Sequence, residues 1–263
     1  MAPSTTFRAL FSRQEVSAAY AALEESKLFG RVASPFRVSH RQKASTTSPP
    51  KVELSVTLQR LRNAGEARRD VPPPLLHVCC GLEAAAMEFA QHILLHESMP
   101  EVARREFLDD IRQRSVFRIW RYSPGIGCRP HYDPGLCTAL LQSSAPGLEV
   151  NLQRDLPSQP GRHGDYRYDE PEVEDLIDAL PGWQAPTPPA AGDDTLLLRS
   201  NMAGVLSNSA LPPVLHRVRS DWAQRGEKVR YSLVVEMRPS HPCRWYNLHQ
   251  ELKAGAEVRV ENK

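Results

Sequence analysis

The sequence predicts an α+β protein whose core is mainly β-structure, arranged as a double-stranded β-helix or jelly-roll barrel. An alanine-rich stretch with apolar residues at helical spacing lies before residue 115, and strand-like segments follow it. Glycine and proline separate these segments, as expected between the short strands of a barrel. The predicted strands are 116–122, 128–133, 136–142, 147–152, 194–199, 203–207, 214–219 and 229–237.

The chain before residue 115 predicts helices joined by irregular segments. A helix should begin near Ser12, and a second should follow the break at Pro72-Pro73-Pro74. Pro100 fits the first turn of a third helix. The helices are expected at 12–29, 82–95 and 99–113, with a flexible loop or linker at 33–50 and, at 51–69, a mixed pattern that also suits a helix.

The length and charge of the chain limit the class of protein it can be. The 263 residues suffice for one sizeable domain or for one domain with an extension, and the 41% of hydrophobic residues allow a normal core. The net charge of +2 predicts no strong attraction to nucleic acid or to an anionic membrane. We expect no apolar run long enough to span a bilayer. The sequence does not determine the oligomeric state.

The five cysteines are an odd number, and no secretory signal precedes them. We therefore expect reduced thiols in an intracellular protein. The cytoplasm is favoured, and the mitochondrion is the alternative because the first fourteen residues contain Arg8 and Arg13 and no acid. Cys79 and Cys80 are interpreted as small apolar residues just before a helix, rather than as a metal or redox pair.

A His-x-Asp pair, His131 and Asp133, falls in one of the predicted strands. Side chains alternate between the faces of a strand, so these two should point the same way. An imidazole and a carboxylate together can occupy two positions on one metal ion. His216, in a later predicted strand, is the candidate third ligand. Two histidines and one carboxylate with open positions suit non-haem Fe(II) and oxygen chemistry.

Arg230 and Ser232 form a second pair that shares one face of a predicted strand. A guanidinium group binds a carboxylate through two parallel hydrogen bonds, and a hydroxyl group can add a third. This pair is therefore a candidate site for a carboxylate.

The ordered motifs resemble the isopenicillin N synthase-like branch of the Fe(II)/2-oxoglutarate-dependent dioxygenases. Each motif is common alone, but the whole ordered series is specific, and it covers about residues 115–238. The matching segments are Tyr122-Ser-Pro124, His131-Tyr-Asp133, Thr138-Ala-Leu-Leu-Gln142, Gly147-Leu-Glu-Val150, Ser207-Asn208, His216-Arg-Val218 and Arg230-Tyr-Ser232.

The resemblance implies a jelly-roll barrel buttressed by helices from the N-terminal half. It also implies Fe(II) as metal, 2-oxoglutarate as co-substrate and O₂ as oxidant. The metal would be held by His131, Asp133 and His216. The co-substrate would meet Arg230 and Ser232, with Tyr122 close to it. The implied reaction oxidises a C–H bond of a small organic substrate by hydroxylation, desaturation or ring closure, with release of succinate and CO₂.

Two other functions remain open at this point. Arg230 and Ser232 could hold a substrate carboxylate without 2-oxoglutarate, as isopenicillin N synthase does. Alternatively, the chain could be a catalytically inactive jelly-roll binding protein. In that case Arg230 would pair with an acid such as Glu227 or Glu236, and Asp133 would only start a turn.

The organisation that follows has three parts and one insert. Residues 1–114 form a helical N-terminal region, 115–238 the dioxygenase core, and 239–263 a C-terminal tail. An acidic insert at about 154–180 departs from the family pattern, and it suits either a lid or a solvated helix.

Overall fold

The computed structural model describes most of the chain. It covers residues 5–26, 28–30, 36–40, 51–63, 70–96, 100–152, 180–188, 194–207, 210–223 and 228–239. Most of the insert, including the helix considered at its end, and the tail beyond residue 239 lie outside these ranges.

The larger of two sheets has seven antiparallel strands in the order β1-β9-β6-β11-β4-β3-β2. Its centre is β11, which pairs with β4 on one side and β6 on the other, so strands far apart in the sequence become neighbours. The strands are β1 (Thr5–Arg8), β2 (Arg37–His40), β3 (Val52–Thr57), β4 (Val116–Tyr122), β6 (Cys137–Leu141), β9 (Thr195–Arg199) and β11 (Arg230–Met237).

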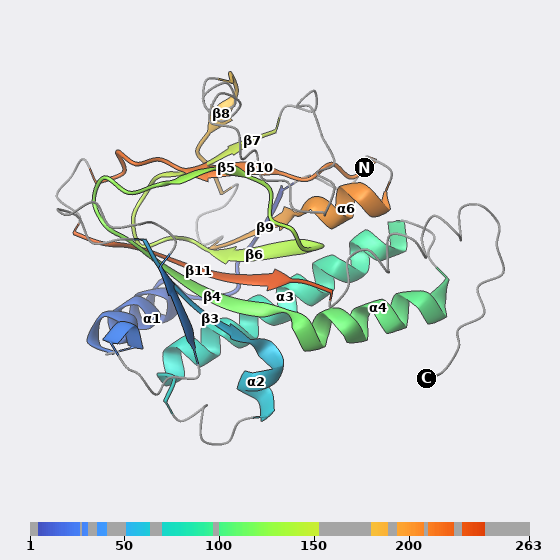
Figure 1. Ribbon diagram of the computed structural model, residues 1–263, viewed down its shortest axis with the longest axis horizontal. Coiled ribbons are helices and arrows are strands. Elements are labelled where there is room, and N and C mark those ends of the chain that lie inside the picture. Colours follow the sequence, from blue (N-terminus) through green and yellow to red (C-terminus); the bar gives the residue numbers. More distant parts are fainter. Residues whose placement is uncertain are drawn as a thin grey trace.

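The smaller sheet has four antiparallel strands in the order β5-β10-β7-β8 and faces the larger one (Figure 1). Val150 and Val214 on its side pack with Leu196 and Leu198 of β9, which joins the two sheets through an apolar cluster. The strands are β5 (Cys128–His131), β7 (Leu148–Asn151), β8 (Trp183–Gln184) and β10 (Leu215–Val218).

Helices cover the outer face of the larger sheet (Figure 1). The long helix α3 crosses β6 and β11, and α4 runs beside it. The helices are α1 (Arg13–Glu25), the short 3₁₀ helix η1 (Leu28–Gly30), α2 (Leu58–Asn63), α3 (Pro73–His96), α4 (Glu101–Arg114) and α6 (Asn201–Leu206).

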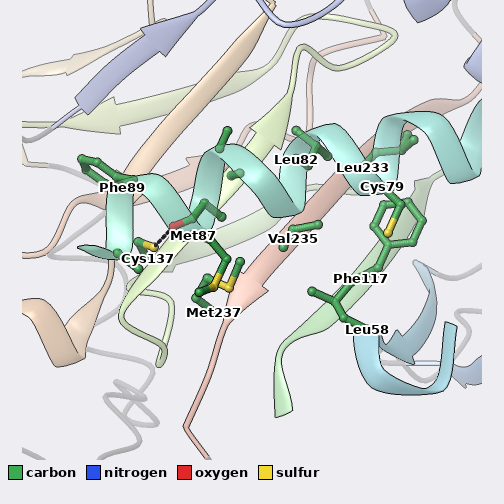
Figure 2. Close-up of a cluster of buried hydrophobic side chains, with 14 of the residues drawn as sticks. Leu58, Cys79, Leu82, Met87, Phe89, Phe117, Cys137, Leu233, Val235 and Met237 are labelled. Carbon is green, nitrogen blue, oxygen red and sulfur yellow. Dashed lines mark hydrogen bonds between the residues drawn. The ribbon is translucent and has the colours of Figure 1, made fainter. Parts of the chain in front are cut away.

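The main core lies between α3 and this outer face. Figure 2 shows Leu82 and Met87 of the helix beside Val235 and Met237 of β11. The Cys137 thiol donates a hydrogen bond to the backbone carbonyl of Ala86, with 3.4 Å between sulfur and oxygen. Burial of this apolar surface, rather than helix propensity, is what fixes the helix on the sheet.

Alternation along β11 separates the core from the site. Leu233 and Val235 face the helices, and both are fully buried in the main core. Arg230 and Ser232 lie on the opposite face, which is turned toward the smaller sheet. The same strand thus stabilises the fold on one face and presents polar groups on the other.

The N-terminal region departs from the expected helical pattern because it also supplies three strands of the larger sheet. Strand β2 lies within the segment expected to be a loop or linker, and β3 opens the segment expected to be partly helical. The loop expectation was wrong at β2, whereas the mixed pattern expected at 51–69 is present as β3 followed by helix α2. The backbone hydrogen bonds that hold β3 come from β4, about 60 residues away, so local composition does not reveal them.

The segment 203–207, predicted as a strand, lies instead in helix α6 and the turn after it. The turn after β5 holds the start of this helix. The amide of Asn201 donates to the carbonyl of Asp133, and that of Met202 donates to the carbonyl of Gly135. These bonds satisfy two N–H groups that lack partners in an isolated helix.

Three expected helices are present, with shifted ends. Ser12 caps α1 through a capping box with Glu15. Helix α3 begins nine residues earlier than predicted, because Pro73 and Pro74 occupy its first turn, where no N–H partner is needed. Cys79 and Cys80 therefore lie inside this helix and not before it.

Helix α3 also corrects the expectation about membrane spans. Within Pro73–Leu95, a window of 18 residues has a mean hydropathy of 1.3, so this stretch is long and apolar enough to cross a bilayer. However, 56% of that window is buried within the protein, and the helix packs on β6 and β11. A buried core helix shows these same properties, so the segment is only weak support for a membrane span.

Candidate metal centre

His131 and His216 are brought together by the pairing of β5 with β10. The two residues are direct partners in the antiparallel register. Their ring centroids are 4.3 Å apart, with an angle of 53° between the ring planes. A register irregularity lies between this pair and the next pair, Cys128 and Val218. His131 is the last residue of β5.

Asp133 completes a cluster of three possible ligands. It lies just after β5 rather than within the predicted strand 128–133, so its direction is set by the following turn. One carboxylate oxygen is 3.7 Å from Nε2 of His131, and the other is 3.7 Å from Nε2 of His216. One ligand atom from each of the three residues lies within 4.8 Å of the others.

Backbone carbonyls fix both imidazole rings. Nδ1 of His131 is 2.8 Å from the carbonyl oxygen of Arg129, and Nδ1 of His216 is 3.1 Å from that of Val214. When Nδ1–H donates to these carbonyls, each Nε2 lone pair is free for a metal.

Thr138 supports the carboxylate. Its hydroxyl donates a hydrogen bond of 2.6 Å to Asp133, and it is also 3.2 Å from the hydroxyl of Ser200. Thr138 belongs to β6 of the larger sheet, so this bond ties the cluster to both sheets. The sequence motif that contains Thr138 was noted, but its role next to Asp133 was not foreseen.

Electrostatics favour an ionised carboxylate at this position. Burial alone would raise the pKa of Asp133, but His216, His131 and the Thr138 hydrogen bond hold it below its usual value. Burial and the neighbouring His131 lower the pKa of His216, which favours its neutral, metal-binding form. A negative carboxylate and the neutral His216 imidazole suit a divalent cation. Although burial opposes it, Cys128 and Asp133 raise the pKa of His131 to about 9, so this ring must lose a proton when a metal binds.

Arg230, Ser232 and Tyr122 form a second group on the inner face of the larger sheet. Arg230 is fully buried, and its Nη1 donates to the Ser232 hydroxyl at 2.6 Å. Nη2 donates to the Ser143 hydroxyl at 2.8 Å, and Nε donates to the carbonyl of Pro146 at 2.9 Å. The Tyr122 ring lies 5.2 Å from the guanidinium carbon.

These contacts bear on the alternative in which Arg230 pairs with an acid such as Glu227 or Glu236. Glu236 does not pair with it, because Arg118 and Arg238 hold the Glu236 carboxylate. Glu227 lies outside the described residues. Three of the five N–H groups of Arg230 contact neutral oxygens, so its positive charge has no counter-ion among the described ion pairs.

A cavity of about 390 Å³ opens beside Arg230. Apolar side chains from both sheets line it, including Phe7, Leu140, Leu148 and Leu196. The three metal-ligand candidates are not among its lining residues. The cavity therefore belongs to the Arg230 side of the interior, where it offers apolar walls and one buried cation.

Lys51 and Cys128 form a polar group that the sequence did not single out. The Lys51 side chain is buried, and the Cys128 sulfur is 3.7 Å from Nδ1 of His131. Burial would raise the pKa of the Cys128 thiol, but Lys51 and His131 hold it well below its ordinary value. Polar Lys51, Glu53 and Ser55 alternate with apolar residues, and this period of two could have revealed the strand in the sequence. The segment had instead been expected to have a mixed pattern that also suits a helix.

The donor set fits a divalent transition metal. Two imidazole nitrogens and one carboxylate converge from one side, and both rings are held by their other nitrogen. This is the arrangement of a facial triad, which leaves further positions open for other ligands. The structure thus brings together the three residues that the sequence predicted as ligands.

Comparison with known proteins gives fold-level relatives only. No family model and no curated protein match the sequence. Three solved structures illustrate the likeness. A Shewanella oneidensis protein classed as an oxygenase has 17% identity and a TM-score of 0.55, with 96% of this chain and 91% of that chain covered.

The second is dioxygenase for auxin oxidation 1 of Arabidopsis thaliana, in complex with 2-oxoglutarate. It has 16% identity and a TM-score of 0.52, with 89% of this chain and 82% of that chain covered. The third, JOX2 in complex with 2-oxoglutarate, iron and JA, has 14% identity and a TM-score of 0.52, with 90% and 67% covered. The chain therefore has the fold of the 2-oxoglutarate–Fe(II) oxygenases, and within that fold it carries a His-Asp-His triad.

Proposed function

We propose that this protein is a non-haem Fe(II)- and 2-oxoglutarate-dependent dioxygenase that oxidises a C–H bond of a small organic substrate. The observation that carries the proposal is the convergence of His131, Asp133 and His216 within 4.8 Å. The oxygenase fold of the solved relatives, two of them with 2-oxoglutarate bound, supports it. The isopenicillin N synthase-like branch and the jelly-roll form of the two facing sheets belong to this proposal.

Each residue has a part to perform. His131, Asp133 and His216 would hold Fe(II) from one side and leave positions for 2-oxoglutarate and O₂. The bound metal, co-substrate and O₂ would supply the oxidising chemistry, with release of succinate and CO₂. The protein itself would bind, orient and exclude water.

Arg230 and Ser232 would bind the far carboxylate of 2-oxoglutarate, with the Tyr122 ring beside them. The guanidinium group is already fixed by two serine hydroxyls and one carbonyl, so little freedom is lost when a carboxylate arrives. Hydroxyls of Ser143 and Ser232 can rotate to donate to the same ligand. The buried positive charge of Arg230 favours an anion there.

An intracellular site of action is part of the proposal. The four described cysteines Cys79, Cys80, Cys128 and Cys137 are free thiols, which accords with a reducing compartment.

The test measures succinate formation from 2-oxoglutarate by protein loaded anaerobically with Fe(II) and then exposed to O₂. Slow turnover without substrate is expected in the wild type and should vanish in His131→Ala. His92→Ala is the control, since His92 is exposed on α3. Absence of both iron binding and succinate would favour the inactive binding protein. Iron binding with no binding of 2-oxoglutarate would favour use of Arg230 for a substrate carboxylate.

A further inference from the structure

A chain of alternating charges crosses the inner face of the larger sheet. Arg118 of β4 forms ion pairs with Glu53 of β3 and with Glu236 of β11, and its Nε is 3.2 Å from one oxygen of Glu236. The other oxygen of Glu236 accepts a hydrogen bond from Nε of Arg238, which follows β11 directly. Glu53, Arg118 and Glu236 are buried, so the chain is enclosed up to its last member.

Arg238 is the open end of this chain. Its side chain is 33% exposed, whereas those of Arg118 and Glu236 are 10% and 4% exposed. Glu236 is shared with Arg118, and it engages Arg238 through Nε. Among the described residues, this is the one ion pair within 4.0 Å that Arg238 forms. Within that part of the chain, its two terminal nitrogens remain available, and their fork matches the two oxygens of a carboxylate.

The register of β11 places this open end beside the metal-ligand candidates. Glu236 is the direct partner of Thr138 on β6, and such partners share a face with Cβ atoms about 4.5–5.5 Å apart. Thr138 in turn donates its hydrogen bond to Asp133. Arg238 borders the same turn, because a Cβ atom at Gly135 would lie 3.4 Å from its Cγ. Burial lowers the pKa of Arg238, but Glu236 and Asp133 are among the groups that raise it.

Arg238 is too far from Arg230 to share one small ligand with it. The two arginines are eight positions apart on one face, which is about 26 Å of extended strand. One 2-oxoglutarate molecule cannot contact both, so a co-substrate held by Arg230 leaves Arg238 for another ligand. A divalent metal on Asp133 would offset the negative charge nearest to Arg238, which strengthens the attraction of Arg238 for an anion.

We propose that Arg238 is a substrate-specificity residue, which binds the carboxylate of an organic acid whose C–H bond is oxidised at the metal. The buried chain of Glu53, Arg118 and Glu236 positions its guanidinium group. This assignment rests on the proposed function, because it takes oxidation to occur beside Asp133. It adds the chemical class of the substrate and a residue outside the ordered motifs.

Three pairs of compounds test this assignment, each an acid and the primary amide of the same shape without the charge. They are benzoate and benzamide, phenylacetate and phenylacetamide, and hexanoate and hexanamide. Calorimetry measures their binding to protein loaded with Mn(II), a metal that supports no turnover, and with saturating 2-oxoglutarate, which keeps the small acids away from Arg230. Arg238→Met removes the charge and Arg238→Lys keeps it. Arg112→Met is the control, because the Arg112–Asp109 pair is exposed.

We expect the wild type and Arg112→Met to bind at least one acid, and to bind its amide at least about tenfold more weakly, because a charge-assisted hydrogen bond is lost. Arg238→Met should bind that acid as weakly as the amide, whereas Arg238→Lys should keep part of the preference. A residue that only supported Glu236 would change the binding of acid and amide alike. The thermal transition checks the fold of each variant, and Arg238→Gln replaces Arg238→Met if the latter does not fold.

Three results would overturn the assignment. Equal binding of acid and amide by the wild type would show that the substrate charge is not recognised. A wild type that binds none of the acids would exclude the carboxylate as the recognised group. A preference for the acid that survives in Arg238→Met would place the anion elsewhere. Failure of the proposed function has a different sign, because the wild type would then bind Mn(II) and no 2-oxoglutarate, and Arg238 would lose its role with it.

Discussion

His131 and His216 are direct partners across the β5–β10 pairing, with ring centroids 4.3 Å apart. The antiparallel register thus brings the two histidines together, which no local pattern predicts because they are 85 positions apart in the chain. The pairing also explains why both Nε2 atoms reach the same Asp133 carboxylate.

His216→Ala should abolish stoichiometric binding of Mn(II) or Fe(II). It removes one of three ligand candidates, so the loss should exceed the about 10- to 100-fold typical of a supporting residue. Electron paramagnetic resonance of free Mn(II) measures it, with His92→Ala as control. Wild-type affinity in His216→Ala would contradict the triad.

Thr138→Val should weaken metal binding by about tenfold while the protein stays folded. The change keeps the shape of the side chain but removes the 2.6 Å hydrogen bond that orients Asp133. Thr187→Val is the matched control, because Thr187 is exposed and contacts only a backbone carbonyl. Equal metal affinity in the two variants would show that Asp133 needs no such support.

Gly135→Ala should lower the free energy of unfolding by about 1–3 kcal/mol, as expected for overpacking. A Cβ atom at this position would lie 2.3 Å from the backbone carbonyl oxygen of Met237, so the backbone must move. Asp133 is two residues away, and metal affinity should fall as well. Urea unfolding and metal titration measure the two effects, and a variant as stable as the wild type would refute the close contact.

Arg118→Met should lower the free energy of unfolding by about 3–5 kcal/mol. Arg118 is buried between Glu53 and Glu236, and its removal leaves buried carboxylates without one cation. Arg112→Met is the control, because the Arg112–Asp109 pair is exposed and should contribute less than about 1 kcal/mol. Similar losses in the two variants would mean that the buried network gives no particular stability.

The ordered motifs predicted the site better than the surrounding fold. Strand β4 has the expected bounds, and seven of the eight predicted strands exist with ends shifted by a few residues at most. Alternation is a local property of a strand, so the pair Arg230 and Ser232 could be placed on one face from the sequence. The eighth segment became helix α6 because contacts with the turn after β5 hold its first turn.

The sequence by itself determined which side chains could hold a metal and a carboxylate, since ligand chemistry and strand alternation depend on residue type and spacing. The tertiary structure alone decided which of them meet. The register of β5 with β10 joins the histidines, and Thr138 from the other sheet orients Asp133. Lys51 shows the same limit, because its aromatic neighbours come from β4 across a strand pairing that no local pattern encodes.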